Sequence, residues 1–91
     1  MTDGWYVYIV ECRDGSLYTG IAKDLNKRVL AHNAGRGARY TKGRGPVILR
    51  YAQPLADRSA ATKRESEIKK LTKAQKNTLI CKQLNLPITT R

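Results

Sequence analysis

Residues 5–22 read WYVYIVECRDGSLYTGIA, and this stretch decides the fold. β-Branched and aromatic residues lie on both sides of Arg13-Asp14-Gly15, a pattern that predicts two strands joined by a tight turn. We expect the strands to span Trp5–Cys12 and Ser16–Ala22. Tyr8 and Tyr18 therefore belong to a sheet and not to loops.

The residues that follow the hairpin predict a short helix and a loop. Asp24 is a suitable N-cap for a helix that runs to about Asn33, in which Leu25 and Val29 stack at a spacing of four residues. Gly35 is placed as the C-terminal stop of this helix. Residues 35–46 contain too much glycine for regular structure, so we expect a loop there.

The second half of the chain predicts one strand and two helices. Residues 47–52 (Val47 to Ala52) form an apolar segment, which we expect to be a central strand of the sheet. Asp57 or Ser59 can cap a helix whose apolar stripe consists of Ala60, Ala61, Ile68 and Leu71. Thr72 looks like the cap of a further helix that runs to about Leu84. We expect an α+β fold with a three-stranded antiparallel sheet flanked by helices, in one domain over residues 1–86 with a flexible tail at 87–91.

The charge of the chain points to a polyanionic partner. Eighteen Lys and Arg residues against seven Asp and Glu residues give a net charge of +11. Residues 1–22 carry one basic and three acidic residues, so the remainder of the chain carries the positive charge. Nucleic acid is the expected partner of such a chain.

Cysteine, histidine and hydropathy patterns exclude several other classes. Cys12 and Cys81 lie far apart without a CxxC motif, and the chain contains one histidine, so a zinc cage is excluded. We find no signal peptide and no apolar run of about 20 residues, and we therefore expect a cytoplasmic protein that contacts no membrane. Any metal is expected to be a hard ion held by carboxylate, phosphate and water oxygens.

The order of these elements and motifs resembles the GIY-YIG endonuclease superfamily, and the likeness covers nearly the whole chain. Tyr6-Val7-Tyr8 stands where the family has Gly-Ile-Tyr, and Tyr18-Thr19-Gly20 stands where it has Tyr-Ile-Gly. Both triplets keep the tyrosine, and Arg28, His32 and a late glutamate follow in the family's order. The chain is most similar to the small, single-domain bacterial members of the superfamily.

The resemblance implies a catalytic role for each of these residues. Tyr8 would act as the general base for the attacking water or relay its proton, and Tyr18 would orient the water or the phosphate. Arg28 would bind the scissile phosphate and stabilise the transition state. His32 would share in proton transfer or hydrogen-bond a phosphate. A phenol needs nearby positive charge to act as a base at neutral pH, and the chain has that charge in excess.

Helical periodicity leaves two candidates for the metal-binding glutamate. Glu65 and Glu67 flank the apolar stripe of their helix, one on each side. In the earlier helix, by contrast, Arg28 and His32 are expected on the same side of the Leu25/Val29 stripe, where they project together. The family pattern selects Glu65, because its glutamate follows a small residue by four, as after Ala61, and precedes an Ile-Lys pair. Glu65 would then be the protein ligand of Mg²⁺ or Mn²⁺.

The expected reaction is metal-dependent hydrolysis of phosphodiester bonds in DNA, which is favoured over RNA as the substrate. Structured or damaged DNA in repair or recombination is a candidate substrate. We expect the protein to be a monomer. The residues expected to contact nucleic acid are Gly20, Lys23, Arg36, Arg39, Tyr40, Lys42 and Arg44. Gly20 would be either a strand bulge or a point of close approach by the substrate. Two alternatives remain at this stage: a nucleic-acid-binding domain with an idle nuclease site, and a domain that docks an acidic protein.

A shared site places a geometric requirement on the hairpin. Tyr8 and Tyr18 lie on one face of the hairpin only if the two residue numbers of each cross-strand pair add up to an even number, as when Tyr8 lies opposite Gly20. A two-residue turn at Asp14-Gly15 gives an odd sum and opposite faces. We therefore predict a three-residue turn over Arg13-Asp14-Gly15, or a bulge. We also expect the five catalytic candidates to converge on one concave surface.

Overall fold

The computed structural model describes residues 4–36 and 41–83 and contains three strands and three helices in those ranges. In chain order these are β1 (Trp5–Glu11), β2 (Leu17–Ala22), α1 (Leu25–Asn33), β3 (Ile48–Leu55), α2 (Arg58–Lys69) and α3 (Lys73–Gln83). The strands form one antiparallel sheet in the order β2-β1-β3. The expected α+β fold is confirmed.

The hairpin between β1 and β2 has the three-residue turn that the shared site requires. The Cys12 backbone N–H donates to the Ser16 carbonyl at 2.8 Å, and the Gly15 N–H donates to the Cys12 carbonyl at 2.9 Å. Gly15 has φ +86°, a conformation that glycine adopts without steric penalty. Tyr8 lies opposite Gly20, so the even-sum register is confirmed.

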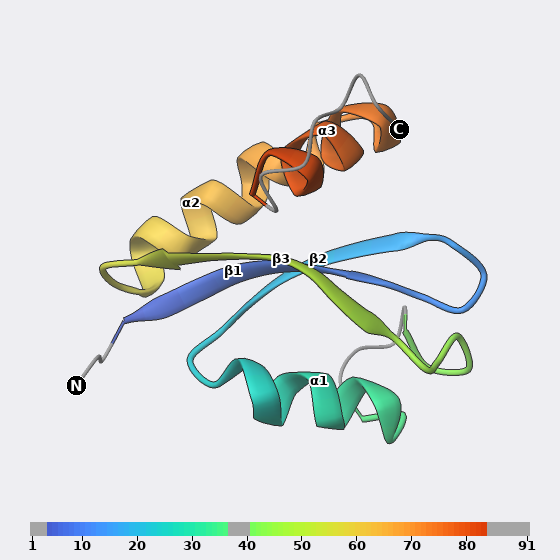
Figure 1. The fold of residues 1–91 in the computed structure, drawn as a ribbon. Coiled ribbons are helices and arrows are strands. Elements are labelled where there is room, and N and C mark those ends of the chain that lie inside the picture. The colour runs from blue at the N-terminus through green and yellow to red at the C-terminus, as the bar shows by residue number, and fades with distance from the viewer. Residues whose placement is uncertain (1–3, 37–40, 84–91) are drawn as a thin grey trace.

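This register gives the sheet two buried faces, each covered by helices (Figure 1). Even-numbered residues of the hairpin face α1, where Tyr8, Val10, Cys12 and Ala22 form a cluster with Val47. Odd-numbered residues of the hairpin face α2 and α3, where Val7 and Ile9 form a second cluster with Tyr51, Ile68 and Ile80. Because both faces of β1 are covered, its residues 7–10 are at most 2% exposed.

The expectation that the third strand is central is wrong, because β1 takes that place and β3 lies at an edge. Ile48 and Leu49 make the sequence of β3 apolar, yet they are 53% and 38% exposed. The strand also continues through Pro54, which lies opposite Tyr6. An edge strand accommodates a proline because one of its sides makes no ladder hydrogen bonds.

The helix caps agree with the sequence. Asp24 caps α1 by accepting from the Lys27 N–H, and Asp57, not Ser59, caps α2 by accepting from the Ala60 N–H. Thr72 and Gln75 form a reciprocal capping box before α3. Leu84 and the tail at 87–91 lie outside the described residues. Within the described ranges, no helix is both long enough and apolar enough to span a membrane.

Candidate active site

The ring of Tyr8 crosses from the central strand onto β2 and lies over Gly20. A Cβ atom at Gly20 would lie 2.6 Å from the Tyr8 hydroxyl oxygen and 2.8 Å from Cζ. The same Cβ would lie 3.1 Å from the Tyr18 ring, whose centroid is 6.5 Å from that of Tyr8. A glycine at position 20 therefore makes room for the two tyrosines to meet.

This arrangement bears on both interpretations of Gly20 and corrects the first. The pairing of β1 with β2 is continuous at this position, so Gly20 is not a bulge. On the side where a Cβ would lie, the space is filled by the Tyr8 phenol, so a substrate does not approach the Gly20 backbone from that side. Gly20 contributes to the site by accommodating Tyr8.

His32 joins Tyr8 to the loop that precedes β3. Its Nε2 atom is 2.9 Å from the Tyr8 hydroxyl, and its Nδ1 atom is 2.7 Å from the Thr41 hydroxyl. His32 and Thr41 are 1% and 0% exposed. Tyr18 packs edge-on against the same imidazole, with ring centroids 5.5 Å apart. The site therefore contains a buried hydrogen-bonded row of phenol, imidazole and hydroxyl.

The position of His32 differs from the one expected on the helix edge. His32 follows Val29 by three residues and Leu25 by seven, so all three share the face of α1 that packs on the sheet. Arg28, which was expected to project beside it, is half-buried. The two residues therefore lie at different depths and have different electrostatic roles.

Burial and neighbouring charges set the protonation of this row. Burial, and then the charge of Arg28, lower the pKa of His32 below its ordinary value of 6.5, so the imidazole is neutral at neutral pH. Burial is also the largest cause that raises the pKa of Tyr8; Tyr18 and Glu65 raise it further, whereas Arg28 lowers it. The excess of positive charge in the chain therefore does not produce a phenolate at Tyr8, contrary to the expectation from sequence. Desolvation outweighs Arg28 here.

The structure distinguishes the two glutamates of α2. Glu65 lies between the buried Ala61 and Ile68 at helical spacing, its side chain is 20% exposed, and its charge acts on Tyr8. Glu67 is 56% exposed and binds Arg64, which in turn donates to Gln53 on β3. The five residues Tyr8, Tyr18, Arg28, His32 and Glu65 are thus linked through Tyr8, either by ring contact, by a hydrogen bond or by electrostatic interaction.

Glu65 offers a single carboxylate to a cation. Lys69 contacts it at 3.1 Å from the next turn of the helix. Among the described residues, no group of three or more His, Cys, Asp or Glu side chains could enclose a metal ion. One partly exposed carboxylate fits an ion that keeps most of its water ligands, as Mg²⁺ does, and does not fit a structural zinc site.

The expected nucleic-acid contacts have varied surroundings. Lys23, Arg36 and Lys42 are exposed, whereas Arg44 forms an ion pair with Asp14 of the hairpin turn. Arg39 and Tyr40 lie outside the described residues. Sequence reasoning missed Thr41 as a partner of His32, since a threonine in a basic loop gives no local signal of a contact nine residues earlier.

Comparisons with known proteins agree with this geometry. The family model described as the GIY-YIG catalytic domain matches residues 4–78. The UPF0213 protein SERP0126 of Staphylococcus epidermidis is 56% identical over 78 residues, which cover 86% of this chain and 95% of that protein. The UPF0213 protein SSP2268 of Staphylococcus saprophyticus is 54% identical over the same length and shares of both chains.

Two solved structures have the same fold. The solution NMR structure of the UPF0213 protein BH0048 from Bacillus halodurans is 42% identical, with a TM-score of 0.55 over 85% of this chain and 82% of that chain. The solution NMR structure of EF2693 from E. faecalis is 37% identical, with a TM-score of 0.59 over 92% and 93%. The match to the catalytic domain and the identity to these small proteins show that this chain belongs to the GIY-YIG family.

Proposed function

We propose that this protein is an endonuclease that hydrolyses phosphodiester bonds in DNA with the help of a divalent metal ion. The observation that supports this most is the buried row from Tyr8 through His32 to Thr41. A neutral imidazole beside a phenol is an arrangement suited to moving a proton, and it lies in a domain whose family is catalytic. The net charge of +11 suits a polyanionic substrate.

The protonation of the row suggests a relay through Tyr8. Because its pKa is raised, Tyr8 starts as a neutral phenol. In the relay that we propose, its hydroxyl donates to the lone pair of His32 Nε2, and the Nδ1–H of the imidazole donates to the Thr41 hydroxyl. When the Tyr8 oxygen accepts a proton from the attacking water, its own proton passes to Nε2. No free phenolate is required.

Arg28 favours the negative charges that this reaction develops, whereas its own charge disfavours the imidazolium that forms at His32. Its positive charge lowers the pKa of Tyr8, so it stabilises negative charge on the phenol oxygen while the proton is in transit. A guanidinium in this place would also bind the scissile phosphate and stabilise its added negative charge. Tyr18 packs against both Tyr8 and His32 and would orient the water or the phosphate.

Glu65 would hold the metal ion, Mg²⁺ or Mn²⁺, with water and substrate oxygens completing its coordination. When bound, such an ion supplies Lewis-acid stabilisation of the leaving oxygen. The carboxylate must exchange its contact with Lys69 for that ion. An i,i+4 ion pair on a helix contributes only about 0.3–0.5 kcal/mol, so the exchange is feasible.

The proposal is tested by incubating the protein with Mg²⁺ and a panel of linear, flapped and branched DNA and RNA substrates. We expect cleavage of DNA that EDTA abolishes and that Tyr8→Phe lowers by about 100-fold or more. Tyr6→Phe is the matched control, because it removes the same hydroxyl two residues earlier on β1 and should retain activity. Salt-dependent binding without cleavage of any substrate would show an idle nuclease site instead.

A further inference from the structure

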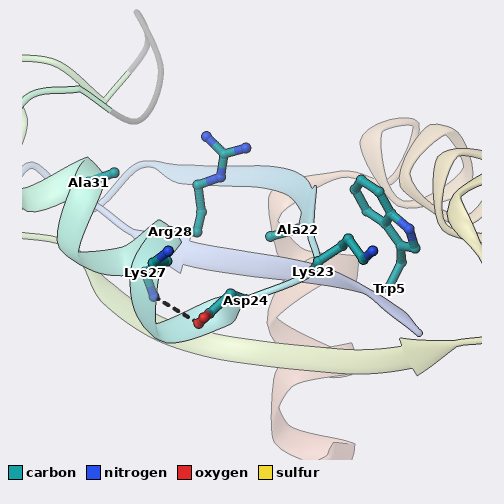
Figure 2. A pocket seen from close by; sticks show the side chains of 7 residues that line it. All are labelled: Trp5, Ala22, Lys23, Asp24, Lys27, Arg28 and Ala31. Carbon is teal, nitrogen blue, oxygen red and sulfur yellow. Dashed lines mark hydrogen bonds between the residues drawn. The ribbon is translucent and has the colours of Figure 1, made fainter. Parts of the chain in front are cut away.

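A pocket of about 360 Å³ opens beside Arg28, between the start of β1 and helix α1. Figure 2 shows Trp5 at one end of this pocket and Arg28 and Lys27 toward the other, with Lys23 beside the indole. Arg28, the residue that would bind the scissile phosphate, therefore forms part of the pocket wall. None of the catalytic roles described above uses its other lining residues.

The charges of the pocket favour an anionic ligand. Lys23, Lys27 and Arg28 line it, and Asp24 is its one acidic lining residue. The Asp24 carboxylate already accepts a hydrogen bond from the Lys27 backbone N–H as the N-cap of α1. An acidic group that caps a helix satisfies the helix N-terminus and offsets the surrounding cations only in part.

The indole of Trp5 adds a feature that a phosphate site does not need. Trp5 is partly exposed, and two cations lie over its ring: Lys23 Nζ at 6.0 Å and Arg58 Cζ at 5.6 Å from the centroid. A nucleotide has both parts of the complementary chemistry, a flat base for the ring and a phosphate for the cations. Inorganic phosphate would use the cations alone.

A base can replace these cations on the ring. A cation–π contact at an exposed site changes an equilibrium by a factor of about 2 to 5. Stacking of a base on an aromatic side chain changes it by about 5-fold to 150-fold. Lys23 and Arg58 have long, flexible side chains, which can turn away from the ring.

We propose that Trp5 stacks an unpaired base of the nucleotide that adjoins the phosphate bound by Arg28. A base within a duplex is already stacked between its neighbours, so it reaches the indole only from a single strand, a flap or a flipped nucleotide. The protein would then prefer substrates with an unpaired nucleotide next to the cut. This inference rests on the proposed nuclease function and specifies the substrate of the same site.

The fluorescence of the wild-type protein tests the contact directly, because Trp5 is the one tryptophan of the sequence. The measurement is made in EDTA so that no cleavage occurs. The probes are a single-stranded DNA of about ten nucleotides, a blunt duplex of the same sequence and inorganic polyphosphate. We expect saturable quenching by the single strand, weaker quenching by the duplex and none by polyphosphate. Equal quenching by polyphosphate would overturn the proposal, because that probe has no base.

Variants give a second measurement. Trp5→Ala should lower the affinity for the single strand by about 5-fold to 150-fold, and Trp5→Phe should restore part of it. The affinity for blunt duplex should change little in both. If Trp5→Ala does not fold, as circular dichroism would show, the comparison of Trp5→Phe with the wild type decides. Unchanged single-strand affinity in a folded Trp5→Ala variant would refute base stacking.

The outcomes separate this inference from the proposed function. Base-dependent quenching in a protein that cleaves nothing would support the stacking site and refute the nuclease. Cleavage without base-dependent quenching would support the nuclease and refute the stacking site.

Discussion

At the scale of single residues, Gly20 controls the geometry around Tyr8. A Cβ at this position would meet the Tyr8 ring at 2.6 Å and 2.8 Å, and that ring is only 2% exposed and cannot move aside freely. We expect Gly20→Ala to displace the phenol from His32, to lower cleavage by about 100-fold, and to reduce the free energy of unfolding by about 1–3 kcal/mol. Cleavage rates and thermal unfolding measure the two effects.

Gly35→Ala is the matched control for this substitution. Gly35 has φ +81° and nothing within 4 Å of an added Cβ, so alanine there costs roughly 1 kcal/mol through backbone strain alone. It should destabilise the protein while leaving the cleavage rate unchanged. Full activity in Gly20→Ala would mean that the contact between Tyr8 and His32 is not needed.

His32 gives the stability of the protein a defined dependence on pH. Its pKa is lowered in the folded state by burial and then by Arg28, whereas the unfolded chain has the ordinary value of 6.5. The unfolded state therefore binds a proton more readily. The stabilisation is fully present above pH 6.5 and is lost as the pH falls below that value toward the pKa of the folded state. For one titrating group, the free energy of unfolding changes by at most about 1.4 kcal/mol per pH unit.

Thermal unfolding between pH 8 and 5 tests this assignment, since His32 is the one histidine of the sequence. His32→Gln should flatten the profile below about pH 6.5. Tyr8→Phe should keep it, because burial is the first cause of the shift and remains. A profile that is equally steep in His32→Gln would assign the pH dependence to carboxylates.

At the scale of elements, the phase of α2 gives its two glutamates different surroundings. Glu65 lies on the stripe between Ala61 and Ile68 and acts on Tyr8, whereas Glu67 turns toward Arg64. We expect Glu65→Gln to lower cleavage by about 100-fold or more and to leave DNA binding equal or stronger, since a negative charge is removed. Cleavage with increasing Mg²⁺ and a separate binding titration measure the two quantities.

Glu67→Gln removes the same charge two residues further along the helix. It breaks an exposed ion pair worth about 0–1 kcal/mol, and its cleavage rate should stay within about twofold of the wild type. The reverse result, with Glu67→Gln inactive and Glu65→Gln active, would exchange the roles of the two residues.

At the scale of the whole molecule, the position of the charges should matter more than their sum. If about five phosphates of duplex DNA are contacted, the slope of log affinity against log salt should be roughly −4 to −5. Lys23 and Lys27 lie in the pocket beside Arg28, and replacing both with alanine should flatten the slope by up to about two units. Sequence preference should not change, because phosphate contacts carry no base information.

Lys73 and Lys82 supply the control for this double substitution. Both belong to α3, on the opposite side of the sheet from α1 (Figure 1), so their replacement removes two charges away from the pocket. The slope should then change much less. Equal changes in the two double variants would show that binding depends on total charge and not on this surface. Arg44 is a poorer choice for either variant, because it already pairs with Asp14.

Local patterns in the sequence determined much of this fold. Asp24 and Thr72 were recognised as caps from their residue types and positions, whereas the pairing of Tyr8 with Gly20 was predicted from the requirement that the two tyrosines of the family pattern share one face. The caps depend on a few consecutive residues, whose steric and hydrogen-bonding preferences act before any tertiary contact forms. The family pattern also selected Glu65 where helical periodicity left two candidates.

Only the tertiary structure decided the strand order and the chemistry of the row at Tyr8. The sequence of an apolar strand such as β3 does not show whether it lies in the centre of a sheet or at its edge, because its position depends on which other strands pair with it. The burial of His32, its contact with Thr41 and the raised pKa of Tyr8 arise where α1, the sheet and a loop meet. Solvent exclusion is a property of that assembly, so no local stretch of sequence could reveal that desolvation outweighs Arg28.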